Sequence, residues 1–200
     1  YWAWGTCFAD FNNDGYLDLF IVNGYDGRTE EQAQSGNYDS FNEDSALLYV
    51  NNGNGTFTNR ATELGILHTA MGRGLVCYDY DRDGDLDMLI ANSGEAPSLY
   101  RNNSFADGNN FLNIRLQGFA DNPQAVGAQI YVSAGGQEQM RELQLGNNYI
   151  SQEPVEAHFG IGNSQVVDSV RIVWPGLEGS ESELRDVEAN RFLVIHQPES

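Results

Sequence analysis

Along most of the chain, short runs alternate between apolar and polar residues. An alternation with a period of two residues is typical of half-buried β-strands. In the first half, such runs (Leu17 to Val22 and Leu86 to Ala91) follow aspartate-rich stretches. In the second half, turn residues separate further runs, at Phe111 to Leu116, Ala128 to Val132, Gln139 to Leu145, Val155 to Phe159, Val166 to Trp174 and Phe192 to His196. No run is long enough to cross a bilayer, so membrane insertion is not expected. The pattern predicts an all-β protein.

The first half repeats itself. Residues 74–94 match residues 5–25 at an offset of 69, and a shorter element, Leu48 to Asn52, recurs as Leu99 to Asn103 at an offset of 51. Such internal similarity indicates a repeat architecture. Between the first unit and Leu47 lies a polar insertion, Tyr25 to Ser45, which we expect to be a surface loop that contacts a partner.

Each long repeat contains one aspartate-rich loop of nine residues. Oxygen-bearing side chains occupy positions 1, 3, 5 and 9, glycine occupies position 6, and position 7 offers its backbone carbonyl. Calcium prefers six to eight hard oxygen ligands, and glycine allows the sharp turn. We therefore predict two calcium ions, one held by each of these sets: Asp10, Asn12, Asp14, Tyr16 (carbonyl) and Asp18; and Asp79, Asp81, Asp83, Asp85 (carbonyl) and Asp87.

An alternative interpretation is a pair of Asp- and Asn-rich turns that cap themselves. That explains one or two aspartates, but not aspartates at positions 1, 5 and 9 of two matching loops, where unneutralised charges repel. The loops also differ from an EF-hand, because position 12 is Ile21 or Ile90 rather than a bidentate glutamate. Asp18 and Asp87 must close the sites instead.

The two loops, the Leu-Tyr-x-Asn-Asn elements and the Gly53 to Phe57 turn resemble the FG-GAP/VCBS repeats of calcium-binding β-propellers. From Phe111 onward the chain resembles the ASPIC/UnbV domain, which follows such repeats in the cartilage acidic protein (CRTAC-like) family. That second resemblance rests on Gly127-Ala128, Gln152 with Pro154, the segment His158 to Gly162, Val170 to Pro175 and Ala189-Asn190. The expected organisation is calcium-binding repeats in residues 1–107 and a small antiparallel β-sandwich or barrel in residues 108–200.

The resemblance implies a secreted or cell-surface protein without established catalysis, although no signal peptide is present in this chain. The repeat region holds two blades at most, whereas a propeller needs about four to eight. We therefore expect open sheet edges that pair with the second domain or with another copy, as a homo-oligomer.

Composition narrows the choice of partners. The chain has 200 residues and a net charge of -19, and all ten of its basic residues are arginine. Nucleic-acid binding is not expected, because phosphate contacts need a basic patch. The two cysteines, Cys7 and Cys77, each lie in an apolar run, and we favour buried thiols over a bridge.

No catalytic residues are predicted. His158 is expected to make a structural hydrogen bond, and Glu153 and Glu156 are expected to be solvated rather than an acid/base pair. The preferred function is a non-enzymatic, calcium-binding extracellular interaction or adhesion module with an unknown protein or glycan partner. The alternatives are an accessory region of a calcium-dependent carbohydrate-active enzyme and a purely structural cell-surface domain.

Overall fold

The computed structural model describes residues 2–24, 44–103, 108–146, 148–176 and 180–199. Within these ranges every regular element is a β-strand, which confirms the predicted all-β class. None of the described segments forms a helix that could cross a membrane. Most of the polar insertion, residues 25–43, lies outside the described residues.

The repeats form two antiparallel sheets. The first has the order β1-β2-β3-β4, from β1 (Ala3–Ala9), β2 (Asp18–Asn23), β3 (Leu47–Asn51) and β4 (Phe57–Asn59). The second has the order β5-β6-β7, from β5 (Gly72–Tyr78), β6 (Asp87–Asn92) and β7 (Ser98–Tyr100). The sheets stack through β1 and β5, and one apolar core fills the space between them.

A disulfide joins the two repeat sheets. Cys7 in β1 and Cys77 in β5 are bonded, with their Cα atoms 6.6 Å apart. The prediction of two buried thiols was therefore wrong. The cysteines are indeed buried, at 7% exposure each, but they lie in the same layer of core rather than in separate ones.

The position of the cysteines within the repeat explains why they meet. At the repeat offset of 69, Cys77 corresponds to Phe8 rather than to Cys7. Neighbouring residues of a strand point to opposite faces of the sheet. When two equivalent sheets stack in the same orientation, the upper face of one meets the lower face of the other. A side chain on the upper face and a side chain on the lower face differ by one position along the repeat, as Cys7 and Cys77 do.

The second half forms two further sheets around its own core. One sheet has the order β10-β9-β12-β13 and contains β9 (Gln129–Ala134), β10 (Gln137–Glu142), β12 (Val166–Val173) and β13 (Glu181–Glu188). The other has the order β11-β8-β14 and contains β8 (Phe111–Gln117), β11 (Ala157–Gly160) and β14 (Arg191–His196). Strands β14 and β8 are parallel, and the other described pairs are antiparallel. The predicted division at residues 107 and 108 stays a prediction, and no described sheet mixes strands from its two sides.

The strands predicted for this half did not include one that the structure contains. Strand β13 was not expected, because its sequence ESELRDVE is mostly polar. It lies at the edge of its sheet, where five of its eight residues are exposed and where apolar alternation is not required.

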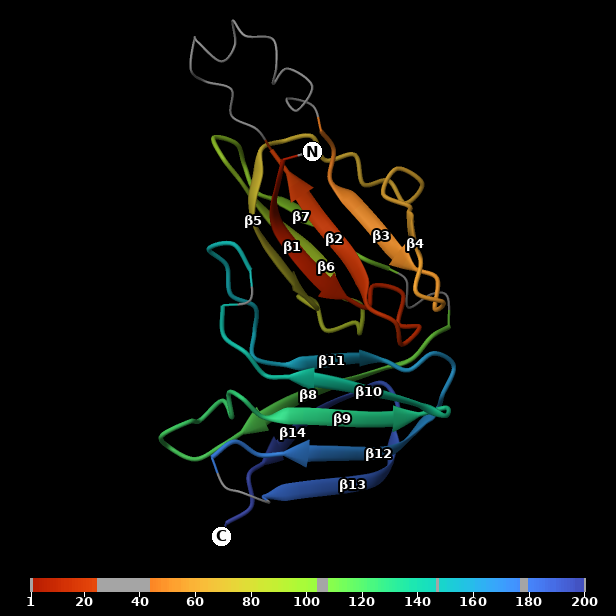
Figure 1. Ribbon diagram of the computed structural model, residues 1–200, viewed down its shortest axis with the longest axis vertical. Helices are drawn as coiled ribbons and strands as arrows, with labels where there is room; N and C mark the ends of the chain where they lie inside the picture. Colours follow the sequence, from red (N-terminus) through yellow and green to blue (C-terminus); the bar gives the residue numbers. More distant parts are fainter. Residues whose placement is uncertain (1, 25–43, 104–107, 147, 177–179, 200) are drawn as a thin grey trace, which may run out of the picture.

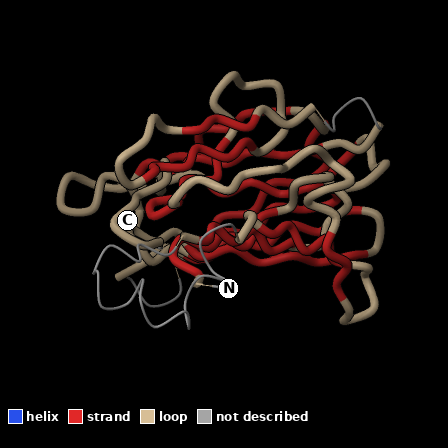
Figure 2. The backbone as a smooth tube through the Cα atoms, turned by 90° about the horizontal axis from the view of Figure 1, so that it is seen from above, coloured by secondary structure: helices blue, strands red, loops and turns tan. Residues whose placement is uncertain are grey.

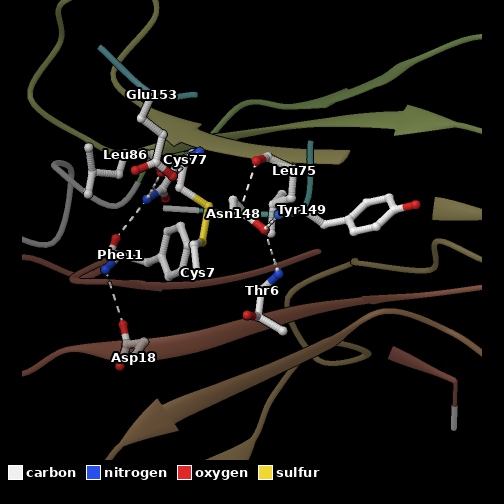
Figure 3. Close-up of a disulfide and its surroundings, with 11 residues drawn as sticks. Thr6, Cys7, Phe11, Asp18, Leu75, Cys77, Leu86, Asn148, Tyr149 and Glu153 are labelled. Carbon is white, nitrogen blue, oxygen red and sulfur yellow. Dashed lines mark hydrogen bonds between the residues drawn. A yellow bond between two sulfur atoms is a disulfide. The ribbon is translucent and has the colours of Figure 1, made fainter. Parts of the chain in front are cut away.

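The repeats and the second half lie end to end along the long axis (Figure 1), so they overlap in the view down that axis (Figure 2). The β1–β2 and β5–β6 turns point toward the second half (Figure 1). A segment before β11 contacts the edge strands of both repeat sheets, and Figure 3 shows its Asn148 between Thr6 of β1 and Leu75 of β5. The Asn148 side chain accepts from the Thr6 amide at 3.0 Å and donates to the Leu75 carbonyl at 2.9 Å. The β1 and β5 edges are thus joined and partly covered from within the chain.

Candidate metal centre in two aspartate loops

Each aspartate loop is the turn between the first two strands of its sheet. The first aspartate holds the turn: Asp10 accepts from the amides of Asp14 (3.1 Å) and Gly15 (2.8 Å). Asp79 accepts in the same way from Asp83 and Gly84. Gly15 and Gly84 have φ angles of 92° and 99°, which agrees with the predicted need for glycine at position 6.

The ninth residue closes each loop. Asp18 accepts from the amides of Phe11 (3.1 Å) and Asn51 (2.8 Å), and Asp87 accepts from those of Tyr80 (3.1 Å) and Asn102 (2.7 Å). Asn51 and Asn102 are the first asparagines of the two Leu-Tyr-x-Asn-Asn elements. Their side chains also donate to the carbonyls of Leu17 and Leu86. The shorter repeat therefore binds the closing aspartate of the longer one. Its recurrence in the sequence marked it as an element of the repeat unit only in the sense of self-similarity, and this contact is visible only in the structure.

The second loop gathers carboxylates at metal-binding distances. Asp79, Asp81 and Asp87 each offer an oxygen that lies within 4.8 Å of the others. Ligands at 2.3–2.6 Å from one calcium ion are at most about 5 Å apart, so these three oxygens fit a single ion. Asp83 accepts from the Asp85 amide within the same turn.

In the first loop the predicted side chains contact one another directly. Asn12 donates to Asp14 at 2.9 Å and accepts from its amide at 3.2 Å, and Asp14 accepts from the Tyr16 amide. Asp10 and Asp18 lie close enough to each other to interact electrostatically. Asn13 of this loop also donates to the side chain of Asp85, at position 7 of the second loop, at 2.9 Å.

Burial makes the loop carboxylates costly to ionise without a counter-charge. It raises the pKa of Asp10 to about 7, with the Asp14 and Asp18 carboxylates adding to the effect. Burial likewise raises the pKa of Asp18 and of Asp87 to about 6 and that of Asp79 above its ordinary value. A divalent cation reverses this penalty, because it stabilises the ionised form.

The two loops differ in the cations that the protein itself supplies. Arg101 pairs with Asp81 at 2.8 Å and with Asp83 at 3.0 Å. Among the described residues, no ion pair reaches Asp10, Asp14 or Asp18 in the first loop. At the offset of the shorter repeat, Val50 takes the place of Arg101. The second loop is therefore paired with an arginine at the position that Val50 occupies beside the first loop.

Three residues for which the sequence predicted no catalytic role connect the repeats to the second half. His158 is buried, and its Nε2 lies 3.0 Å from the Gly84 carbonyl, which confirms the expected structural hydrogen bond. Glu153 accepts from the Cys77 amide at 3.1 Å, and Glu156 pairs with Arg82 at 2.9 Å. The prediction that both glutamates are simply solvated was wrong, because the second half packs against the repeats.

A cleft of about 330 Å³ lies where the two loops meet the second half. Its lining includes the first aspartate of each loop and charged groups of the second half: Asp10, Asp79, Arg141, Glu153, Glu156 and His158. Burial lowers the pKa of the Arg141 guanidinium, which lies over the Phe159 ring.

Comparisons with known proteins match both halves of the chain. Residues 118–200 match the family model described as ASPIC and UnbV, and residues 35–90 match the model described as FG-GAP-like repeat. The second range includes the loop at 79–87, and the first loop lies before it. The chain is also 28% identical over 135 residues to cartilage acidic protein 1 of Mus musculus, covering 64% of this chain and 20% of that protein. The Homo sapiens protein of the same name matches at 28% over 134 residues, with 64% and 19% covered. The chain thus spans about a fifth of the length of these relatives.

Proposed function

We propose that this chain, whose two halves match the FG-GAP-like repeat and the ASPIC and UnbV family models, is a non-enzymatic, calcium-binding extracellular interaction module. Each aspartate loop takes one calcium ion, and the ions hold the loops in shape. The observation that carries this proposal is the matching pair of loops, in which buried first and ninth aspartates converge from equivalent positions.

Calcium is favoured over magnesium by the kind of ligand that the loops offer. Each loop supplies four oxygen-bearing side chains and a carbonyl, whereas magnesium usually keeps several waters and uses one or two carboxylates. The ligands in the proposal are those predicted from the spacing. Arg101 competes for Asp81 and Asp83, so the second site includes a partner that the ion must displace or accommodate.

Calorimetry and thermal melting test the calcium sites. We expect two calcium ions to bind and to raise the melting temperature by several degrees, with a smaller effect from magnesium. Asp18→Asn and Asp87→Asn each remove one closing carboxylate and should abolish one site. Asp168→Asn changes an exposed aspartate of β12 and is the matched control. Identical melting curves in calcium and in chelator would contradict the proposal.

An extracellular location is supported by the disulfide, since such bonds persist in oxidising compartments. The surface presented by the calcium-loaded repeats, including the insertion Tyr25 to Ser45, is proposed to bind a protein or glycan. Protein pull-down and glycan arrays, each with calcium and with chelator, test this role. Turnover of a glycan, rather than binding alone, would favour the enzyme alternative.

Self-association through the remaining repeat edges is a further part of the proposal. Strands β4 and β7 end the described sheets on the side away from β1 and β5. Light scattering of the whole chain tests it, and a strictly monomeric mass at all concentrations would remove this part.

A further inference from the structure

The fourth position of each aspartate loop points out of the loop toward its neighbours. Asn13 and Arg82 are equivalent at the offset of 69, and both have left-handed backbones, with φ angles of 57° and 61°. Asn13 donates to the Gly84 carbonyl (3.3 Å) and to Asp85 (2.9 Å), which joins the first loop to the second. Arg82 pairs with Glu156 and lies over the Phe192 ring, which joins the second loop to the second half. Neither residue belongs to the predicted ligand set.

Four loop carbonyls accept hydrogen bonds from groups beyond the repeats. Their donors and distances are as follows: Asn12 from the Asn109 side chain (2.8 Å), Asn13 from the Gly162 amide (2.8 Å), Gly15 from the Gln137 side chain (3.0 Å) and Gly84 from His158 (3.0 Å). Because these carbonyls belong to the turns themselves, the bonds form only while the loops keep their present shape.

The contact surface is also fitted to the loops sterically. A Cβ added at Gly160 would lie 2.1 Å from an Asp10 carboxylate oxygen and 2.4 Å from the Asn13 Cα. On the other side, a Cβ at Gly84 would lie 2.1 Å from the Phe111 ring. Gly160 lies in the segment His158 to Gly162, so this segment packs against the first loop at Asp10, the first predicted ligand of that loop.

We propose that the segment His158 to Gly162 is a docking surface for the metal-loaded loops, so that calcium binding and attachment of the second domain to the repeats strengthen each other. This inference rests on the proposed calcium sites. An ion holds the carboxylates together and fixes the turn, and the fixed turn presents its carbonyls to Gly162, Gln137 and His158. Coupling of this kind is reciprocal, so docking must raise calcium affinity by the same factor that calcium raises docking.

Gly160→Ala is the first test, because the added methyl group pushes on Asp10 and Asn13 from the docking segment and replaces none of the predicted ligand residues. Calorimetry should show calcium binding to the first loop weakened tenfold or more. Asn163→Ala changes an exposed residue just beyond the segment and should bind calcium as the native chain does.

Asn13→Gly is the second variant, and it serves if Gly160→Ala fails to fold. Glycine accepts the φ of 57° and keeps the carbonyl for Gly162, but it removes the bonds to Gly84 and Asp85. Calcium affinity should fall severalfold.

Hydrogen exchange reads the docking directly. In the native chain, calcium should slow exchange of the Gly162 amide by tenfold or more, while the amides of Val170 and Ile172 in the centre of β12 change little.

The outcomes separate the inference from the function on which it rests. If no calcium binds, the proposed function fails and the inference falls with it. If calcium binds but Gly162 exchanges at the same rate, or if both variants bind calcium as the native chain does, the inference is overturned and the calcium sites stand.

Discussion

Single side chains decide how much of each loop's charge the protein neutralises by itself. Arg101 holds Asp81 and Asp83 in the second loop, whereas the equivalent Val50 supplies no charge to the first. Oxygen-bearing side chains occupy positions 1, 3, 5 and 9 of both loops, so the spacing alone predicted one site in each. The side chain contributed by the neighbouring strand adds a difference in charge that this spacing does not record.

Arg101→Val should therefore tighten calcium binding to the second loop severalfold and lower the calcium-free melting temperature, because the aspartates lose a competing cation. Calorimetry in an Asp18→Asn background isolates this site. Arg185→Val removes a comparable arginine from its pair with Glu183 on β13 and should leave calcium binding unchanged. Unaltered affinity in Arg101→Val would show that Arg101 does not compete with the ion.

At the scale of elements, the disulfide fastens two sheets that share a core. Cys7 and Cys77 are 70 residues apart, and together with Leu75 and Phe20 they lie between the stacked sheets. A cross-link over so long a loop restricts the unfolded chain strongly. The bond therefore stabilises the stack of the two repeat sheets.

The double variant Cys7→Ala/Cys77→Ala should lose about 2–4 kcal/mol of unfolding free energy, as measured by urea denaturation in calcium. The native chain treated with reductant should lose a similar amount, since both lack the bond. A double variant as stable as the oxidised native chain would show that packing alone holds the sheets.

At the scale of the whole molecule, the second half is attached to the repeats through polar contacts with the loops and edge strands. His158 is at the centre of this contact, between the Gly84 carbonyl and the stacked Phe111 ring. Burial, together with the nearby Arg141 charge, lowers its pKa to about 4, while the hydrogen bond to Gly84 opposes the shift. The His158 imidazole is therefore neutral in the folded protein at neutral pH.

Lowering the pH should reduce the free energy of unfolding through protonation of His158. Between its unfolded pKa of 6.5 and its folded pKa of about 4, the unfolded chain binds the proton and the folded chain does not. The contribution of His158 to stability is thus complete above pH 6.5 and is lost as the pH falls toward 4, by about 3 kcal/mol in all.

Denaturation at several pH values checks this dependence. His158→Gln keeps a donor for Gly84 but cannot be protonated, so its stability should fall less than that of the native chain over this range. His196→Gln alters an exposed histidine and is the control. Equal pH dependence in the His158 variant and the native chain would contradict the expectation.

Much of the fold and of the candidate site was predictable because the signals are local. Alternating apolar runs located most strands, and the predicted ligands of each loop lie within nine residues. Strand β13 escaped because an exposed edge needs no apolar pattern. Asn51 and Asn102 were recognised as repeated, but their bonds to Asp18 and Asp87 span 33 and 15 residues.

The sequence by itself determined the all-β class, the repeat and the two oxygen-rich turns, because strand period and turn chemistry depend on neighbours along the chain. Only the tertiary structure decided that Cys7 meets Cys77, that Arg101 serves one loop alone, and that Asn13 and His158 join the loops to the second half. Those contacts depend on which faces and turns meet in space, and residues far apart in sequence carry no local pattern that records such a meeting.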